Sequence, residues 1–337
     1  MKSETLILNK ERNVTLTVYL QPVGGEFQDL NLRPAVLILP GGGYHFCSDR
    51  EADPVAFAYL KAGYHVFILR YSLGDCSVWP NPLSDYEQAI TLIRQNAGEW
   101  HVAADRIVVL GFSAGGHLAA CAATMAENRP NAAILGYPVI TGETVRDYCP
   151  SAPDAAEAVD EKTCPCFIFT TRTDNLVPVE NTLRFLAALE RKEIAFESHI
   201  YASGPHGLST GESSLCRDGY SSRYPNWVAD SISWLSEVLG SFGPQGLKEP
   251  VFGAKINGNR EEFLNLDCTF QYLANHPEAR ALPFLTELEN SDIPMPPAAR
   301  NVVTLRDCLT YSGASEEKIQ AIEASLKAIK NGKQYRD

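Results

Sequence analysis

Short apolar runs alternate with helix-forming stretches along the first 240 residues. Runs such as 34–39 and 106–110 are continuously apolar, which is typical of strands buried on both faces of a parallel sheet. Strands that alternate with helices predict βαβ units and a mostly parallel central sheet flanked by helices, an α/β fold. The expected strands are 5–8, 14–20, 34–39, 65–69, 106–110, 132–135, 165–170 and 194–200. The expected helices are 54–62, 84–98, a stretch that follows Ser113, 178–190 and 224–239.

Two details bear on where the helices begin and where the first domain ends. Ser84 and Glu87 have the spacing of a capping box, which predicts a helix that begins at Ser84. Residues 241–260 are rich in glycine, proline and polar side chains, which predicts a linker. Residues 261–337 have helical spacing, most clearly at Ile319, Ile322 and Leu326. We therefore expect domains at 1–240 and 261–337, the second a small, mainly helical appendage.

Composition excludes several classes of partner. The formal net charge of −12 disfavours nucleic acids and anionic membrane surfaces. No run approaches the roughly 18–20 apolar residues that span a bilayer. The first residues do not have the pattern of a secretory signal, and the nine cysteines lack a zinc-ligand spacing. These features predict a cytoplasmic protein with free thiols and no metal site.

The stretch Gly111-Phe112-Ser113-Ala114-Gly115 has the form G-x-S-x-G. An apolar run precedes it and helix-forming residues follow it, and this is the context of a nucleophile elbow, a strained strand-to-helix turn that presents a serine. A serine in that position indicates covalent acyl-transfer chemistry. Ser113 is therefore the predicted nucleophile.

A serine hydroxyl needs a base to accept its proton and a carboxylate to orient that base. Proteins with this elbow have the chain order serine, acid, histidine. His206 lies in the turn-forming loop Ser203-Gly204-Pro205-His206-Gly207, after the last expected central strand. Asp174 lies in the loop after the run 166–170, at the carboxyl end of a strand. Asp174 and His206 are the predicted acid and base, ahead of Glu180 and Asp160.

A glycine-rich loop follows the strand at 34–39. In Pro40-Gly41-Gly42-Gly43-Tyr44, glycine lets backbone N–H groups approach a developing oxyanion closely. Gly42, Gly43 and Ala114 are the predicted oxyanion-hole donors. A phosphate loop is the alternative, but no Gly-Lys-Ser/Thr follows. This chemistry requires no metal and no cofactor.

The glycine loop and the extended elbow Gly111–His117 together resemble the α/β-hydrolase family, in the esterase branch that contains acetylxylan and feruloyl-type esterases. The resemblance covers roughly residues 15–240 and implies the roles given above for Ser113, Asp174 and His206. Related esterases often have histidine where this chain has Pro40. The C-terminal appendage lies outside the resemblance.

The resulting hypothesis is a serine carboxylesterase that removes short acyl groups, most simply acetyl, from a sugar or xylo-oligosaccharide. Tyr44, His45, Trp79, Tyr137 and Tyr148 are candidate substrate contacts. A serine peptidase or amidase on the same fold and a non-catalytic binding protein are the alternatives, and a long-chain lipase fits less well. Acyl length, the alcohol portion and the role of the appendage stay open. The chain is compatible with a homo-oligomer.

Overall fold

The computed structural model describes residues 1–27, 30–216, 219–243, 246–250, 258–289 and 296–332. The chain forms two compact units, Met1–Ala254 and Lys255–Asp337. Each unit has hydrophobic core residues of its own and is described by itself. Residues 244–245 and 251–257, which belong to the predicted linker, lie outside the described residues.

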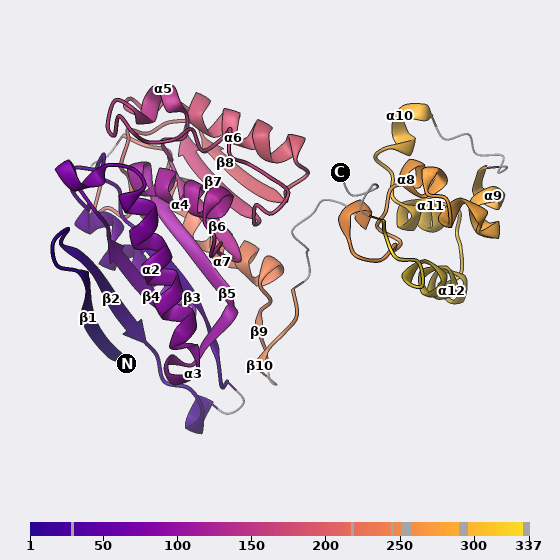
Figure 1. Cartoon of the computed structure of the whole chain (residues 1–337), viewed down its shortest axis with the longest axis horizontal. Coiled ribbons are helices and arrows are strands. Elements are labelled where there is room, and N and C mark those ends of the chain that lie inside the picture. Colours follow the sequence, from indigo (N-terminus) through magenta and orange to yellow (C-terminus); the bar gives the residue numbers. More distant parts are fainter. Residues whose placement is uncertain (28–29, 217–218, 244–245, 251–257, 290–295, 333–337) are drawn as a thin grey trace. The chain divides into compact units, whose positions relative to one another are not determined.

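The first unit is built on an eight-stranded sheet in the order β1-β2-β4-β3-β5-β6-β7-β8 (Figure 1). β1 pairs antiparallel with β2, and β2 pairs antiparallel with β4. All other neighbouring strands are parallel, so their carboxyl ends meet at one edge of the sheet. The strands are β1 Lys2–Asn9, β2 Val14–Leu20, β3 Arg33–Leu39, β4 His65–Arg70, β5 Val102–Phe112, β6 Ala132–Gly136, β7 Cys166–Thr171 and β8 Phe196–Tyr201.

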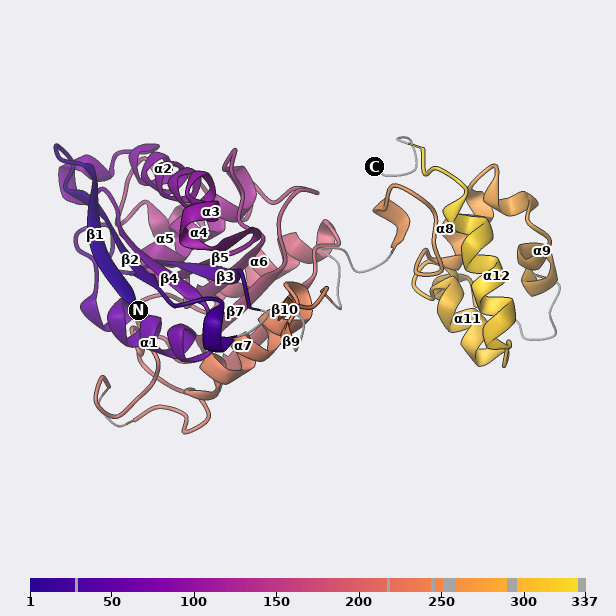
Figure 2. The same ribbon diagram turned by 90° about the horizontal axis from the view of Figure 1, so that it is seen from below.

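Helices cover both faces of this sheet (Figure 2). Residues of α2, α3, α4 and α6 pack into one core, and residues of α1 and α7 pack into the other. Side chains that alternate along β3 divide between the two cores: Leu37 and Leu39 enter the first, and Val36 and Ile38 the second. This two-sided burial explains why the strand is continuously apolar. The helices are α1 Asp53–Lys61, α2 Asn81–Gln95, α3 Ala97–Trp100, α4 Ser113–Met125, α5 Gly142–Val145, α6 Glu180–Arg191 and α7 Asn226–Val238.

Shorter elements complete the two units. A two-stranded hairpin of β9 Phe242–Gly243 and β10 Gly246–Leu247 follows α7 in the first unit. The 3₁₀ turns are η1 Gly25–Phe27, η2 Asp49–Glu51, η3 Gly74–Ser77, η4 Gly258–Arg260 and η5 Ala279–Ala281.

The second unit is largely helical. It contains α8 Phe270–Asn275, α9 Pro283–Glu289, α10 Pro297–Arg300, α11 Leu305–Tyr311 and α12 Glu316–Lys327. Phe270, Leu273, Leu305 and Leu326 belong to its buried core, which gives the unit an apolar interior of its own. The residues that precede α8 and α11, Thr269 and Thr304, form a β-bridge that joins the two helix starts. The predicted α/β fold with a helical C-terminal region is therefore confirmed.

One predicted helix start was wrong. α2 begins at Asn81 rather than Ser84, and the Ser84 N–H donates to the Pro80 carbonyl within the helix. Pro82 lies in the first turn, where a missing N–H costs nothing, so the helix gains a turn. The Glu87 carboxylate accepts the N–H groups of Glu127 and Asn128 instead of capping its own helix. Pro82, two residues before Ser84, is the sequence feature that indicates the earlier start of this helix.

Within the described ranges, no helix is both long enough and apolar enough to cross a membrane. All nine cysteines lie in those ranges as free thiols.

A buried histidine joins α4 to two loops. The His117 side chain lies between the Tyr44 hydroxyl, 2.6 Å from Nδ1, and the Pro153 carbonyl, 2.9 Å from Nε2. Because the Pro153 carbonyl only accepts, Nε2 carries the proton and Nδ1 accepts from Tyr44. Burial lowers the pKa of His117 from 6.5 to about 4, and burial of His65 lowers its pKa to about 4 as well. Both imidazoles are therefore neutral in the folded protein at neutral pH.

These histidines predict a loss of stability in mild acid. Between pH 6.5 and 4 the unfolded chain binds protons that the folded chain excludes, so the free energy of unfolding falls as the pH falls through this window. For His117 alone the loss reaches about 3 kcal/mol at the lower end. Urea denaturation from pH 7 to pH 4.5 measures it, and His117→Gln, which cannot titrate, should make the dependence shallower. A free energy of unfolding that stays constant down to pH 5 in the natural protein would contradict the expectation.

Candidate active site

The turn between β5 and α4 is tightly packed. Ser113 has a φ of 54°, a left-handed conformation that a non-glycine residue adopts only under local constraint. A Cβ on Gly111 would collide with the carbonyl oxygen of Gly115, and a Cβ on Gly115 would collide with that of Leu39. The first turn of α4 therefore lies directly against the end of β3. This close approach requires glycine at both positions and holds Ser113 at the carboxyl edge of the sheet.

Ser113, His206 and Asp174 form one hydrogen-bonded chain. The His206 Nε2 lies 2.9 Å from the Ser113 Oγ, and the Nδ1 lies 2.8 Å from the Asp174 Oδ2. A carboxylate can only accept, so Nδ1 carries the proton and Nε2 accepts from the serine hydroxyl. The Asp174 side chain is 1% exposed and the His206 side chain 13%. The buried Asp174 carboxylate thus orients the His206 imidazole, and the Nε2 atom of the ring faces Ser113.

Two loops that follow adjacent strands supply the acid and the base. Asp174 follows β7, and its Oδ1 accepts the N–H groups of Leu176 and Val177, each at 2.9 Å. His206 follows β8, and the Thr171 hydroxyl donates to the Gly204 carbonyl at 2.7 Å, which joins the two loops. The carboxylate therefore has hydrogen bonds on both oxygens, and its position relative to the imidazole is fixed.

The glycine loop follows β3 and faces the same edge. Gly42 and Gly43 have φ values of 137° and 60°, and the Tyr71 hydroxyl donates to the Pro40 carbonyl at 2.6 Å. Among the described residues, no protein atom accepts from the N–H groups of Gly42 or Gly43. The N–H of Ala114 lies in the first turn of α4, where the helix offers no acceptor. These three N–H groups are free to bind a ligand oxygen.

A pocket of about 260 Å³ opens at this edge. Ser113 and His206 line it, together with Gly42, Gly43, Arg50, Glu51 and Gly207. Its apolar wall is formed by Phe46, Val139, Tyr148 and Leu176. A compact space of this size accommodates a small group next to the Ser113 hydroxyl.

Only some of the candidate substrate contacts line this pocket. His45 and Tyr148 line the pocket, but Tyr44 does not, because its side chain is fully buried against His117. Tyr137 is 2% exposed and packs edge-on against the His206 ring at 4.9 Å. Trp79 packs edge-on against His117 at 5.6 Å. Tyr44, Trp79 and Tyr137 are thus not among the residues that line the pocket, since their rings pack against His117 or His206. Their roles as substrate contacts stay predictions.

Sequence reasoning missed Glu51, which lines the pocket and is 3% exposed. It lies in the polar stretch Ser48-Asp49-Arg50-Glu51, which resembles a solvated surface turn. Ten residues separate it from Gly41, whose N–H donates to the Glu51 Oε2 at 2.8 Å. No local pattern distinguishes this buried carboxylate from its exposed neighbour Asp49.

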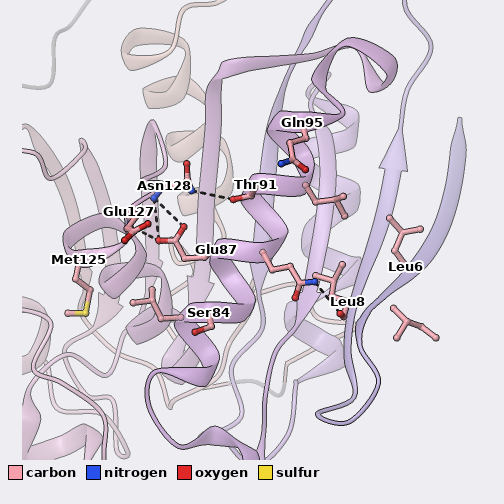
Figure 3. Close-up of a pocket in the computed structure, with 13 residues that line it drawn as sticks. Leu6, Leu8, Ser84, Glu87, Thr91, Gln95, Met125, Glu127 and Asn128 are labelled. Carbon is pink, nitrogen blue, oxygen red and sulfur yellow. Dashed lines mark hydrogen bonds between the residues drawn. The ribbon is translucent and has the colours of Figure 1, made fainter.

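A larger hollow of about 850 Å³ lies elsewhere, along α2 (Figure 3). Leu6 and Leu8 of β1 line it, with Ser84, Glu87, Thr91 and Gln95 of α2. Its polar groups are engaged with one another: Glu87 accepts the N–H of Asn128, and the Asn128 amide donates to Thr91. It holds no nucleophile next to a base, so the smaller pocket is the candidate active site.

Among the described residues, no group of three or more histidine, cysteine, aspartate or glutamate side chains is placed to hold a metal ion.

Comparisons with known proteins agree with this fold. The family described as BD-FAE matches residues 26–138, and the prolyl oligopeptidase family matches residues 141–241. The solved structure of MGS-M1, an alpha/beta hydrolase enzyme from a Medee basin deep-sea metagenome library, is 41% identical with a TM-score of 0.66. The match covers 71% of this chain and 98% of that one.

Two curated relatives are named for xylan chemistry. Endo-1,4-beta-xylanase B of Butyrivibrio fibrisolvens is 32% identical over 52% of this chain and 33% of its own length. Acetylxylan esterase of Xylanibacter ruminicola is 30% identical over 58% of this chain and 45% of its own length. The match thus spans a third to under half of these two relatives.

A mostly parallel sheet with a serine on the strand-to-helix turn is typical of serine hydrolases that have the α/β-hydrolase fold. The chain belongs to the α/β-hydrolase family, in its esterase branch.

The packing at the elbow predicts a position-dependent effect of adding one methyl group. Gly115→Ala should destabilise the first unit by about 2 kcal/mol or more, because the new Cβ meets the carbonyl oxygens of Leu39 and Pro40. Gly98→Ala in α3 is the matched control, since a Cβ there meets nothing within 4 Å. It should be neutral or stabilising by about 0.5 kcal/mol. Urea denaturation compares the two, and equal stabilities would contradict the proposed close approach.

Proposed function

We propose that this chain is a serine carboxylesterase that hydrolyses short acyl esters, acetyl esters first, of a sugar or xylo-oligosaccharide. The observation that carries the proposal is the hydrogen-bonded chain of Ser113, His206 and Asp174 beside the free N–H groups of Gly42, Gly43 and Ala114. Ser113 and His206 line one pocket with Gly42 and Gly43, and Asp174 is hydrogen-bonded to His206 behind it, which supports the constellation that acyl transfer requires.

The reaction proceeds in two steps. His206 Nε2 accepts the Ser113 proton as the Oγ attacks the ester carbonyl, and the carbonyl oxygen gains negative charge. The N–H groups of Gly42, Gly43 and Ala114 stabilise that charge, while Asp174 stabilises the imidazolium. His206 then protonates the leaving alcohol, which departs and leaves an acyl group on Ser113. Water attacks the acyl-enzyme with His206 as base and regenerates the serine.

The pocket supports a preference for short acyl groups. Its volume of about 260 Å³ is at or below the usual lower bound for small-molecule sites. Phe46, Val139 and Leu176 give it an apolar side, which suits a methyl or short alkyl group next to the carbonyl. The acetylxylan esterase relative supports acetylated xylose units as the first substrates to test.

A serine peptidase or amidase is the second candidate. The prolyl oligopeptidase family matches residues 141–241, which include Asp174 and His206. The same catalytic groups cleave amides where the leaving amine is bound and protonated. Turnover of acyl p-nitroanilides that is lost in Ser113→Ala would favour this candidate. A non-catalytic binding protein, the third hypothesis, requires the absence of turnover on both anilides and esters.

The first experiment measures hydrolysis of p-nitrophenyl acetate, butyrate and octanoate, followed by acetylated xylo-oligosaccharides. Acetate should give the highest kcat/KM. Ser113→Ala should lower kcat by roughly 10⁴- to 10⁶-fold, because the covalent step is lost. Asp174→Asn should lower kcat by about 10⁴-fold, because the imidazole is no longer held in the required tautomer.

Ser236→Ala is the matched control. Ser236 lies on α7, its hydroxyl donates to the Ser233 carbonyl, and it takes no part in the proposed site. This variant should retain full activity. An inactive natural protein on every ester, or undiminished activity in Ser113→Ala, would refute the esterase proposal.

A further inference from the structure

Glu51 is a second buried carboxylate in the pocket, and the acyl-transfer steps above assign it no role. It ends the short turn η2, Asp49–Glu51, and its neighbours in that turn are exposed. Burial of a charged group is costly unless hydrogen bonds compensate. The two oxygens of Glu51 are both compensated, by donors from two different parts of the site.

The first donor belongs to the glycine loop. The Gly41 N–H donates to the Glu51 Oε2 at 2.8 Å. A Cβ on Gly41 would lie 2.7 Å from the carbonyl oxygen of Phe112 and 2.9 Å from the Ser113 Cβ. Gly41 is thus packed against the elbow, immediately before Gly42 and Gly43, which line the pocket and are the proposed oxyanion donors. A displacement of Gly41 moves the amides of Gly42 and Gly43 relative to Ser113.

The second donor lies beside the histidine. The Tyr137 hydroxyl donates to the Glu51 Oε1 at 2.5 Å and accepts the N–H of Ser209 at 3.1 Å. The Tyr137 ring packs edge-on against His206, with ring centroids 4.9 Å apart and planes at 71°. Tyr137 and Ser209 have φ values of 35° and 51°, so both are held in a left-handed conformation next to the site. Glu51 therefore fixes a ring that forms one wall of the histidine site.

The hydrogen-bond pattern fits the ionised form of Glu51. Both of its oxygens accept, and the Tyr137 hydroxyl uses its only proton toward Glu51. Burial raises the pKa of Glu51, while the bonds from Tyr137 and Gly41 and the charge of His206 act in the opposite direction. Among the described residues, Glu51 makes no ion pair with lysine or arginine, and its bonds run to Gly41 and Tyr137.

We propose that Glu51 is a positioning residue for the esterase reaction: its two oxygens set the oxyanion amides and, through Tyr137, the His206 ring relative to Ser113. The inference rests on the proposed function. It assigns Glu51 no contact with the reacting atoms, because Asp174 already occupies the Nδ1 side of His206 and Ser113 the Nε2 side. Glu51 affects the positions of the amides and of His206 relative to Ser113, and these positions matter most when the oxyanion forms.

Glu51→Gln tests this with little change in volume. An amide offers one acceptor and one donor, so it can satisfy Gly41 or Tyr137 but not both. We expect kcat per active site to fall by about 10- to 100-fold, because small displacements of catalytic groups have effects of that size. KM should change by less than about threefold, because the loss falls on the transition state rather than on substrate binding.

Asp49→Asn is the matched control. Asp49 lies in the same turn and carries the same charge, but its side chain is 86% exposed and pairs with Arg70. Both variants remove one negative charge from η2, so a general electrostatic effect would appear in both. We expect Asp49→Asn to keep the kcat of the natural protein.

Tyr137→Phe is a separate variant that tests the proposed link from Glu51 through Tyr137 to His206. It removes the hydroxyl that Glu51 accepts from but keeps the ring against His206. We expect about a 3- to 10-fold loss in kcat. In the double variant Glu51→Gln/Tyr137→Phe, no hydroxyl at residue 137 needs an acceptor from the amide. The combined loss in kcat should therefore be smaller than the product of the two single losses.

Each variant is measured in two ways. Titration with a fluorophosphonate, which phosphonylates the serine and releases fluoride, counts active sites and gives a rate that needs no ester substrate. Ester turnover is then expressed per titrated site, which separates a loss of folded protein from a loss of rate. If the natural protein reacts with the fluorophosphonate but hydrolyses no ester, the esterase proposal fails, and the phosphonylation rates still test Glu51.

The positioning role is overturned if Glu51→Gln and Asp49→Asn have the same kcat per site and the same phosphonylation rate. It is also overturned if Glu51→Gln raises KM with kcat unchanged, which would make Glu51 a binding residue. Strictly multiplicative losses in the double variant would overturn the coupling through Tyr137. A slower phosphonylation in Glu51→Gln, with the control unaffected, supports the inference.

Discussion

The close approach of α4 to the end of β3 is the constraint on which the site depends. Gly111 and Gly115 have no side chain to hold the backbones apart, so the first turn of the helix rests against the carbonyl groups of Leu39 and Pro40. This contact places the Ser113 hydroxyl and the Ala114 N–H beside the loop that leaves β3. The proposed nucleophile and oxyanion donors are therefore positioned by the close packing of main-chain atoms.

The remaining groups reach the same point because the sheet is parallel. β3, β5, β7 and β8 all end at one edge, so the loops after them converge although the sequence separates them widely. Polar links then fix these loops to one another: Thr171 to Gly204, Glu51 to Gly41 and Tyr137, and Tyr44 to His117. Strained backbone at Ser113, Tyr137 and Ser209 persists because several such contacts act on each.

Patterns in the sequence predicted the parts of this arrangement that depend on strand order. Ser113, Asp174 and His206 each follow an expected strand, so their convergence follows from a parallel sheet, although their catalytic roles stay predictions. The direction of side chains within loops could not be predicted from the sequence. Tyr44 and Tyr137 were candidate substrate contacts, but their rings are buried and do not line the pocket, and a loop has no periodicity from which side-chain direction can be inferred. Glu51 was missed for the same reason, because burial of one acid in a polar turn depends on contacts with Tyr137, which lies 86 residues away.

The order in which the chain is made has a consequence for the serine. Ser113 and His206 are 93 residues apart, and Asp174 and His206 lie in the loops that follow the last two strands of the sheet, β7 and β8. A ribosome that has extruded β3, β5 and α4 has exposed the elbow and the glycine loop without the imidazole. The Ser113 hydroxyl, the proposed nucleophile, thus lacks its proposed base until β7 and β8 join the sheet. In the proposed mechanism, reactivity at Ser113 therefore depends on completion of this edge of the sheet.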